Sequence, residues 1–266
     1  MSGKSLQSIT SRTNGRVKNA IYLRENTAAR RDSGYLFLEG ARLCADAAAN
    51  GFQIMELFVT EIAMVKYANY LYQPLERAQA SFMIMEHVAD ALADTKTSQG
   101  IFGIVKKPGE SQLDLSKGSK YLALENVRDP GNVGTLLRTA EAFGLSGVIH
   151  SGCGDVYSPK ALRAGMGAQL RLPLWRAENL PKLLLDAAAS GTSTFAAVMN
   201  DNAMPITKAF SGSNTLVVAI GNEANGLTAQ TIAACEKCVT IPMAGRAESL
   251  NAAAAGAVIC WELQRQ

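Results

Sequence analysis

The chain has 266 residues, of which 48% are hydrophobic and 18% charged, and its formal net charge is +3. This composition is typical of a globular protein with a sizeable core and excludes a disordered chain. No apolar run approaches the roughly 20 residues that a membrane-spanning helix needs, and the N-terminal residues lack the apolar core of a signal peptide. We therefore expect a cytoplasmic protein of one large or two smaller domains that does not enter a membrane.

The basic residues are concentrated near the N-terminus. Residues 1–42 contain eight Lys or Arg against three Asp or Glu, whereas residues 121–266 contain 11 of each kind. A basic segment of this kind suits the phosphate backbone of a nucleic acid, with a merely solvated surface as the alternative. We take Arg12, Arg16 and Lys18 as candidate RNA-binding residues.

The first 107 residues alternate between predicted strands and helices. The pattern predicts strands and helices over the following ranges: strand 34–40, helix 41–51, strand 54–60, helix 66–80 interrupted by Pro74, strand turning into helix over 81–94, and strand 100–107. Residues 108–120 have the composition of a linker. We therefore place a domain boundary there, between domains at 1–107 and 121–266.

The second half alternates more regularly. The predicted order is strand 121–127, loop 128–134, helix 135–144, strand 146–151, helix 158–170, strands 194–199, 215–220 and 238–243, and a final helix 249–263. The strands at 194–199 and 215–220 are apolar without polar alternation, as expected when both faces of a sheet are covered. This order predicts an α/β fold with a parallel sheet.

Three predicted loops leave the strand ends with unusual composition. Residues 125–134, 221–228 and 241–251 each combine glycines with Asn, Glu, Ser or Arg. In an open parallel sheet, ligands bind beyond the carboxyl ends of the strands, so these loops indicate one binding site. None contains the glycine pattern of a Rossmann nucleotide site or a P-loop, which counts against a nucleotide-dependent dehydrogenase.

These loops carry a family resemblance. The segments NVGTLLRTAEAFG, VVAIGNEANGLT and IPMAGRAESLNAAAAGA resemble motifs 1, 2 and 3 of the SpoU/TrmH RNA methyltransferases of the SPOUT superfamily. The N-terminal segments ITSRTNGRVK and FLEGARL resemble the substrate-binding domain that many members carry. The resemblance implies a parallel-sheet SPOUT domain with a C-terminal trefoil knot, preceded by a smaller α/β RNA-binding domain.

The resemblance also implies an activity. Such a protein is a homodimeric 2′-O-ribose methyltransferase that uses S-adenosylmethionine and acts on structured RNA, with rRNA as the first expectation and tRNA as the rival. From a different class, a non-catalytic RNA-binding protein that retains the fold is the alternative. The residues that match the family's functional positions are Asn132, Arg138, Glu223, Ser249 and Asn251 for catalysis, and Gly221, Ile241 and Leu250 for the cofactor.

Individual roles follow from the resemblance and from local chemistry. We expect Arg138 just inside a helix N-terminus, clamping the phosphate of the target nucleotide, with Glu223 holding Arg138 or an RNA hydroxyl in place. Ser249 is also a candidate N-cap, and Ile241 and Leu250 are also candidate core residues. Ala224 replaces a glycine common in the family, which puts the loop geometry in question.

Other features carry weaker signals. Lys160 and Arg163 are candidate RNA contacts, with plain surface charge as an equal alternative. The five cysteines are an odd, scattered number that argues against a disulfide framework. Cys235 and Cys238 form an isolated C-x-x-C, which we interpret as two half-buried residues, with zinc and redox roles as the alternatives. The two histidines have no metal-ligand spacing, so we expect no metal.

Overall fold

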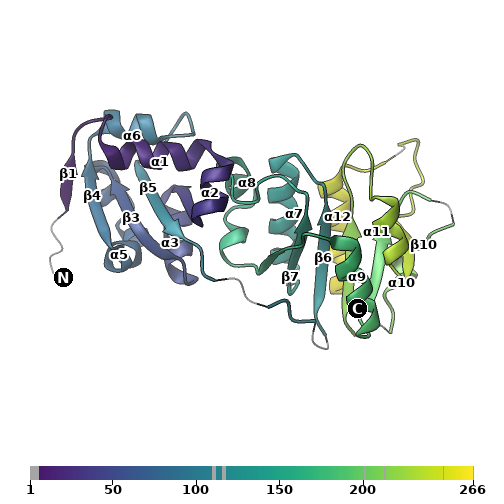
Figure 1. Ribbon diagram of the computed structural model, residues 1–266. Coiled ribbons are helices and arrows are strands. Elements are labelled where there is room, and N and C mark those ends of the chain that lie inside the picture. Colours follow the sequence, from purple (N-terminus) through teal and green to yellow (C-terminus); the bar gives the residue numbers. More distant parts are fainter. Residues whose placement is uncertain are drawn as a thin grey trace. The chain divides into compact units, whose positions relative to one another are not determined.

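The structure is a computed structural model that describes residues 6–109, 112–115, 118–200, 202–212, 214–247 and 249–265. The chain divides into two compact units (Figure 1). Unit 1 comprises Met1–Gly109 with Tyr157–Pro159, and unit 2 comprises Glu110–Val156 with Lys160–Gln266. Among the described helices, none combines the length and apolar character that crossing a bilayer requires.

Unit 1 is a mixed sheet with helices. Its strands are β1 (Gln7–Ile9), β2 (Tyr35–Glu39), β3 (Gln53–Val59), β4 (Ala80–Ile84) and β5 (Ile101–Lys106), in the order β1-β4-β3-β5-β2. Its helices are α1 (Gly15–Glu25), α2 (Thr27–Ser33), α3 (Ala41–Ala49), α4 (Glu61–Lys66), α5 (Ala68–Arg77) and α6 (Glu86–Leu92). Strand β5 runs antiparallel to both of its neighbours, and the other pairs are parallel.

The predicted strands of unit 1 are confirmed, but two helical details differ. Helices α1 and α2 were not predicted because both are rich in polar residues; Asn14 and Asn26 begin them by accepting hydrogen bonds from backbone N–H groups. Pro74 does not interrupt its helix. The predicted helix is instead divided at Tyr67, between α4 and α5, and α5 continues through the buried Pro74 to Arg77. The proline removes only one backbone donor from that helix.

The described residues of unit 2 form a sheet of seven parallel strands. They are β6 (Lys120–Glu125), β7 (Gly147–Ser151), β8 (Leu174–Arg176), β9 (Ser193–Ala197), β10 (Met204–Pro205), β11 (Leu216–Ile220) and β12 (Lys237–Thr240), in the order β10-β12-β9-β11-β6-β7-β8. Every neighbouring pair is parallel, which confirms the predicted sheet. The central strands β6 and β11 are almost completely buried, as their unbroken apolar runs predict.

Helices cover this sheet in pairs. They are α7 (Pro130–Ala142), α8 (Pro159–Ala164), α9 (Leu180–Ala189), α10 (Ile206–Ala209), α11 (Ala229–Ala234) and α12 (Ala252–Gln264). Helix α7 packs against α12, and α9 packs against α11 (Figure 1). The approach of α7 to α12 depends on Gly256, because a Cβ atom there would lie 2.1 Å from Cδ2 of Leu136.

The structure corrects two predicted helix starts that matter for the site. Helix α7 begins at Pro130 rather than at residue 135, with Asp129 as its N-cap. Gly134, which suggested a loop, lies inside the helix, where a Cβ atom would approach the carbonyl oxygen of Ala161 to 2.4 Å. The glycine therefore serves close helix packing instead of a turn. Helix α12 begins at Ala252 with Asn251 as N-cap, so the alternative that Ser249 caps this helix is wrong.

Candidate active site

The three predicted loops meet beyond the ends of the parallel strands of unit 2. Nδ2 of Asn132, in the first turn of α7, donates a hydrogen bond of 2.8 Å to Oε1 of Glu223. Nδ2 of Asn251, at the start of α12, donates one of 3.2 Å to Oδ1 of Asn132. One amide side chain thus links residues that are 91 and 119 positions away from it in the sequence. We call Asn132, Glu223 and Asn251 the polar cluster.

A cavity of about 310 Å³ lies beside the polar cluster. The end of β11, the loop that follows it, the end of β12 and the start of α12 form its walls. Gly221, Ile241 and Leu250, the predicted cofactor residues, line it together with Glu223 and Ser249. A mainly apolar cavity with a few polar groups at one side has the general character of a small-molecule site.

The loop between β11 and α11 is held in shape by hydrogen bonds among its own residues. Oδ1 of Asn222 accepts hydrogen bonds from the backbone N–H groups of Ala224 and Asn225, and Asn222 pairs with Gly226 through backbone hydrogen bonds. Gly221 has no room for a side chain, because a Cβ atom there would lie 2.1 Å from the carbonyl carbon of Gly226. Ala224 does not adopt a positive φ, so the loop accommodates this residue where the family commonly has glycine.

Two contacts that sequence reasoning missed fasten this loop to the end of β6. Glu125 is only 5% exposed, and its carboxylate accepts hydrogen bonds from the N–H and the hydroxyl of Thr228 and from the hydroxyl of Thr231. At the other end of the loop, Nδ2 of Asn222 donates to the carbonyl of Asn126 at 2.8 Å. The signal was present in the sequence, since Glu125 is a charged residue that ends an otherwise apolar strand.

Arg138 lies elsewhere than predicted. It occupies the third turn of α7, so it is not at a helix N-terminus, where free N–H groups favour anions. Its backbone position is roughly 9 Å along the helix axis from that of Asn132. The side chain is exposed, and within the described residues it makes no hydrogen bond or ion pair. The described partners of Glu223 are Asn132 and Asn222, not Arg138.

The N-terminus of α7 is instead occupied by a carboxylate of the chain itself. Oδ1 of Asp129 accepts a hydrogen bond of 2.9 Å from the backbone N–H of Asn132, and Oδ2 lies 3.3 Å from Nζ of Lys160. The hydrogen bond from Asn132 and the nearby ammonium hold the pKa of Asp129 below its ordinary value. Of the predicted RNA contacts in α8, Lys160 is therefore already paired, and Arg163 is half-buried.

The predicted RNA-binding residues of unit 1 also differ in their surroundings. Nε of Arg12 donates to the carbonyl of His87 at 2.7 Å. Arg16 pairs with Glu56, and its guanidinium lies 4.8 Å from the ring centre of Phe82. Lys18 is exposed, and its ammonium has no hydrogen bond or ion pair within the part of the chain that is described. The three residues thus do not form one uniform basic surface.

The five cysteines are free thiols. Burial raises the pKa of Cys235 to about 12 and that of Cys153, which lies at the end of β7, to about 11. Thiols with such values stay protonated near neutral pH and are poor nucleophiles. Among the described residues, no three or more His, Cys, Asp or Glu side chains are grouped as metal ligands.

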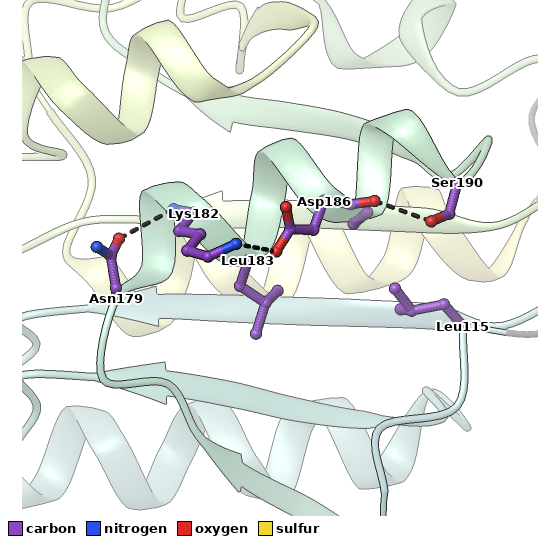
Figure 2. Close-up of a pocket in the computed structure, with 7 residues that line it drawn as sticks. Leu115, Asn179, Lys182, Leu183, Asp186 and Ser190 are labelled. Carbon is purple, nitrogen blue, oxygen red and sulfur yellow. Dashed lines mark hydrogen bonds and ion pairs between the residues drawn. The ribbon is translucent and has the colours of Figure 1, made fainter.

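A second hollow, of about 370 Å³, runs along α9 (Figure 2). Its polar groups are already paired: Nζ of Lys182 lies 2.8 Å from Oδ2 of Asp186, and the hydroxyl of Ser190 donates to the Asp186 carbonyl. None of the residues that line it comes from the three glycine-rich loops at 125–134, 221–228 and 241–251. The cavity beside the polar cluster is therefore the candidate active site.

The fold and this cluster define a class of RNA-modifying enzyme, and the comparisons place the chain within it. Residues 119–261 match the SpoU rRNA Methylase family, and residues 14–103 match the MRM3-like substrate binding domain. The chain belongs to the SpoU rRNA methylase family.

Relatives and solved structures resemble the chain over nearly its whole length. It is 28% identical to the 23S rRNA (guanosine(2553)-2′-O)-methyltransferase of Bacillus subtilis, over 97% of this chain and 100% of that one. It is 31% identical to an uncharacterized tRNA/rRNA methyltransferase of Synechocystis, over 98% and 94%. The AdoMet-bound rRNA methyltransferase from Sinorhizobium meliloti superposes with a TM-score of 0.87, at 30% identity and 98% coverage of both chains.

Proposed function

We propose that this protein transfers the methyl group of S-adenosylmethionine to the 2′-oxygen of a ribose in rRNA. The observation that carries the proposal is the polar cluster, in which Asn132, Glu223 and Asn251 from three separate loops are hydrogen-bonded beside a mainly apolar cavity. The names of its relatives as rRNA 2′-O-methyltransferases support this substrate. A tRNA substrate is the nearest alternative, because one relative is described as a tRNA/rRNA methyltransferase.

The cavity suits the proposed cofactor. S-adenosylmethionine supplies an electrophilic sulfonium methyl group. Gly221, Ile241 and Leu250 would hold it, the side chains through apolar contact with the adenine and the loop through backbone groups. The tight packing of Gly221 against Gly226 keeps this wall of the cavity thin, which lets the main chain approach a ligand closely.

The polar cluster would orient the ribose. The Glu223 carboxylate receives one hydrogen bond from Asn132 at Oε1 and a longer one of 3.4 Å from Asn222 at Oε2, and it remains exposed enough to accept a hydrogen bond from a ribose hydroxyl. Ser249 at the cavity mouth would contact the same nucleotide. We assign Arg138 to the phosphate of that nucleotide, because its exposed guanidinium can bind a phosphate with two hydrogen bonds. Positioning of this kind accounts for much of the rate in transfer reactions.

The proposal has three further parts. We assign RNA binding to residues 1–107, supported by the substrate-binding family match over 14–103. We propose a homodimer through α12, supported by the exposed Val258 and Trp261, which are 38% and 52% accessible. We place the protein in the cytoplasm because its cysteines are free and its proposed substrate is rRNA. The trefoil knot stays a prediction.

The test supplies radiolabelled S-adenosylmethionine with deproteinised rRNA or tRNA and follows label incorporation. We expect 2′-O-methylation of rRNA. Binding of S-adenosylmethionine, measured by calorimetry, separates the enzyme from the non-catalytic alternative: a dimer with no detectable cofactor affinity would support an RNA-binding protein that only retains the fold.

Arg138→Ala tests the assigned chemistry. We expect this variant to lose methyl transfer while its affinity for S-adenosylmethionine stays within a few-fold of the wild type, because Arg138 does not line the cofactor cavity. Turnover at the wild-type rate would contradict the role proposed for this arginine.

A further inference from the structure

A third cavity borders the loop that carries Glu223. It has a volume of about 340 Å³ and is lined by Asn126, Arg128, Asn222, Asn225 and Thr228 and by the backbone at 226–227. Asn222, Asn225, Gly226 and Leu227 line both this cavity and the proposed cofactor cavity. The loop therefore borders both cavities.

The chemistry of this third cavity differs from that of the proposed cofactor cavity. A guanidinium, amides and a hydroxyl line it, and no carboxylate among the described residues does so. The Asn222 amide and the Thr228 hydroxyl are already used to fasten the loop to Asn126 and Glu125. Arg128 and Asn225 are exposed, and their side chains make no hydrogen bond or ion pair within the described ranges. Their donors are available to a ligand.

The position of Arg128 is fixed by its backbone. It lies in the short turn between β6 and α7, two residues beyond Asn126. The backbone N–H of Gly154 donates to the neighbouring carbonyl of Val127 at 2.9 Å, and Gly154 lies so close that a Cβ atom there would approach the Arg128 carbonyl to 2.7 Å. The guanidinium thus extends from an ordered turn.

Arg128 also differs from the neighbouring cation. Lys160, on the other side of the α7 N-terminus, lies 3.3 Å from the Asp129 carboxylate, which already satisfies its charge. The nearby carboxylates of Glu125 and Asp129 are already bound by Thr228, Thr231 and Lys160. An exposed cation without such a partner, beside a cavity whose described lining contains no carboxylate, favours an anion. A planar guanidinium is especially suited to phosphate, which it binds through two parallel hydrogen bonds.

We infer that the cavity beside Arg128 is a subsite for a phosphodiester of the RNA strand, next to the nucleotide that is methylated. Arg128 binds the phosphate, and the Asn225 amide contacts the adjoining sugar. This inference rests on the proposed function, because the strand must run from Glu223 across the loop to reach Arg128. It adds a binding group that none of the three family motifs contains.

The experiment compares full-length wild type with Arg128→Ala and Arg128→Lys. Affinity for deproteinised rRNA is measured across a salt series, and affinity for S-adenosylmethionine by calorimetry. We expect Arg128→Ala to weaken RNA binding about tenfold at low salt, as the loss of a charged hydrogen bond predicts. Its slope of log affinity against log salt should be about 0.7 to 1 smaller. Arg128→Lys should keep the slope and recover only part of the affinity, and cofactor affinity should not change.

Lys182→Ala is the matched control. Lys182 is also an exposed cation of unit 2, but it is paired with Asp186 on α9, away from both cavities. Wild-type affinity and salt slope in Arg128→Ala would overturn the subsite, as would a loss of cofactor affinity, which would show that Arg128 acts by shaping the loop. If the wild type itself neither bound nor methylated rRNA, the proposed function would fail first. If the wild type methylated rRNA and Arg128→Ala bound rRNA equally well, only the subsite would be contradicted and the proposed function would stand.

Discussion

The arginines of the two units have different partners. In unit 1, the guanidinium groups of Arg12, Arg24 and Arg30 donate to backbone carbonyl oxygens of their own unit. In unit 2, Arg128 and Arg138 near the candidate site are exposed and make no such contact within the described residues. The basic N-terminal segment therefore overstates how much charge is available to RNA, whereas in the electrically neutral second half the guanidinium groups of Arg128 and Arg138 have no such partner among the described residues.

The sheet of unit 2 explains where its polar side chains gather. Because all seven strands of unit 2 are parallel, their carboxyl ends lie at one edge, and the loops that leave them converge on one site. In unit 1, β1, β2, β3 and β4 also share one direction and only β5 opposes them, so strand direction alone does not distinguish the two units. The hydrogen-bonded polar cluster of unit 2 does. The comparison makes a general prediction: polar substitutions should affect catalysis in unit 2 and stability or RNA affinity in unit 1.

Outside the proposed catalytic residues, Glu125→Gln should give the largest effect. The carboxylate accepts three hydrogen bonds from Thr228 and Thr231, whereas an amide would place its own N–H groups against one of these donors. An unsatisfied buried donor costs about 1–3 kcal/mol. If that energy is lost from the loop that positions Glu223, methyl transfer should fall about tenfold to a hundredfold. Steady-state kinetics with labelled cofactor measures this, together with the melting temperature.

Thr231 supplies a matched pair of controls for the same contact. Thr231→Val removes the hydroxyl that donates to Glu125 and keeps the side-chain volume, whereas Thr231→Ser keeps the hydroxyl. We expect the valine variant to share the kinetic defect of Glu125→Gln and the serine variant to retain most of the activity. A kinetic defect equal in both variants, or one that follows the melting temperature alone, would mean that Glu125 only stabilises the fold.

Arg30→Met in unit 1 should lower stability and leave activity unchanged, in contrast to Glu125→Gln. Arg30 is 4% exposed, and its guanidinium donates to the carbonyls of Leu23 and Arg24 and to the hydroxyl of Thr27. Removing these donors should lower the free energy of unfolding by about 1–3 kcal/mol. Urea unfolding measures the change, and activity per folded molecule should stay at the wild-type level. Arg31→Met, which removes an exposed pair with Asp32, is the control with little expected effect.

Sequence patterns predicted the sheet and much of the candidate site because both depend on local signals. The sequence pattern predicted β6, β7, β9, β11 and β12 but not the short β8 and β10, and the glycine-rich polar loops at the strand ends predicted one shared site. The family resemblance supplied Asn132, Glu223 and Asn251, which the structure brings together. The start of α7 was placed too late because Gly134 was interpreted as a loop residue. Its actual role, close packing against Ala161, depends on a contact between two helices that no local pattern reveals.

The features that the sequence did not predict depend on which hydrogen-bond partners the fold brings to each side chain. Arg12 and Lys18 are indistinguishable as basic residues in a basic segment, yet only the fold brings the His87 carbonyl to Arg12. Similarly, Glu125 is separated from Thr231 by 106 positions, so their hydrogen bond follows from the pairing of β6 with β11. Residue type predicts what a side chain can bind. Tertiary structure decides whether its hydrogen-bonding groups are used by the protein itself or remain available to a ligand.

Lys18→Ala should give the smallest effect, and it can be compared with Arg12→Ala in the same unit. Its ammonium is exposed and makes no polar contact in the described part of the chain, so we expect it to contribute one phosphate contact. Loss of that contact should reduce the salt slope of rRNA binding by about 0.7 to 1 and leave stability unchanged. Arg12→Ala should instead lower stability, because it frees the His87 carbonyl, and should change the salt slope less. If the two variants showed the same loss of slope, the carbonyl contact would not keep Arg12 from the RNA, and backbone partners would be a poor guide to which cations of unit 1 are available.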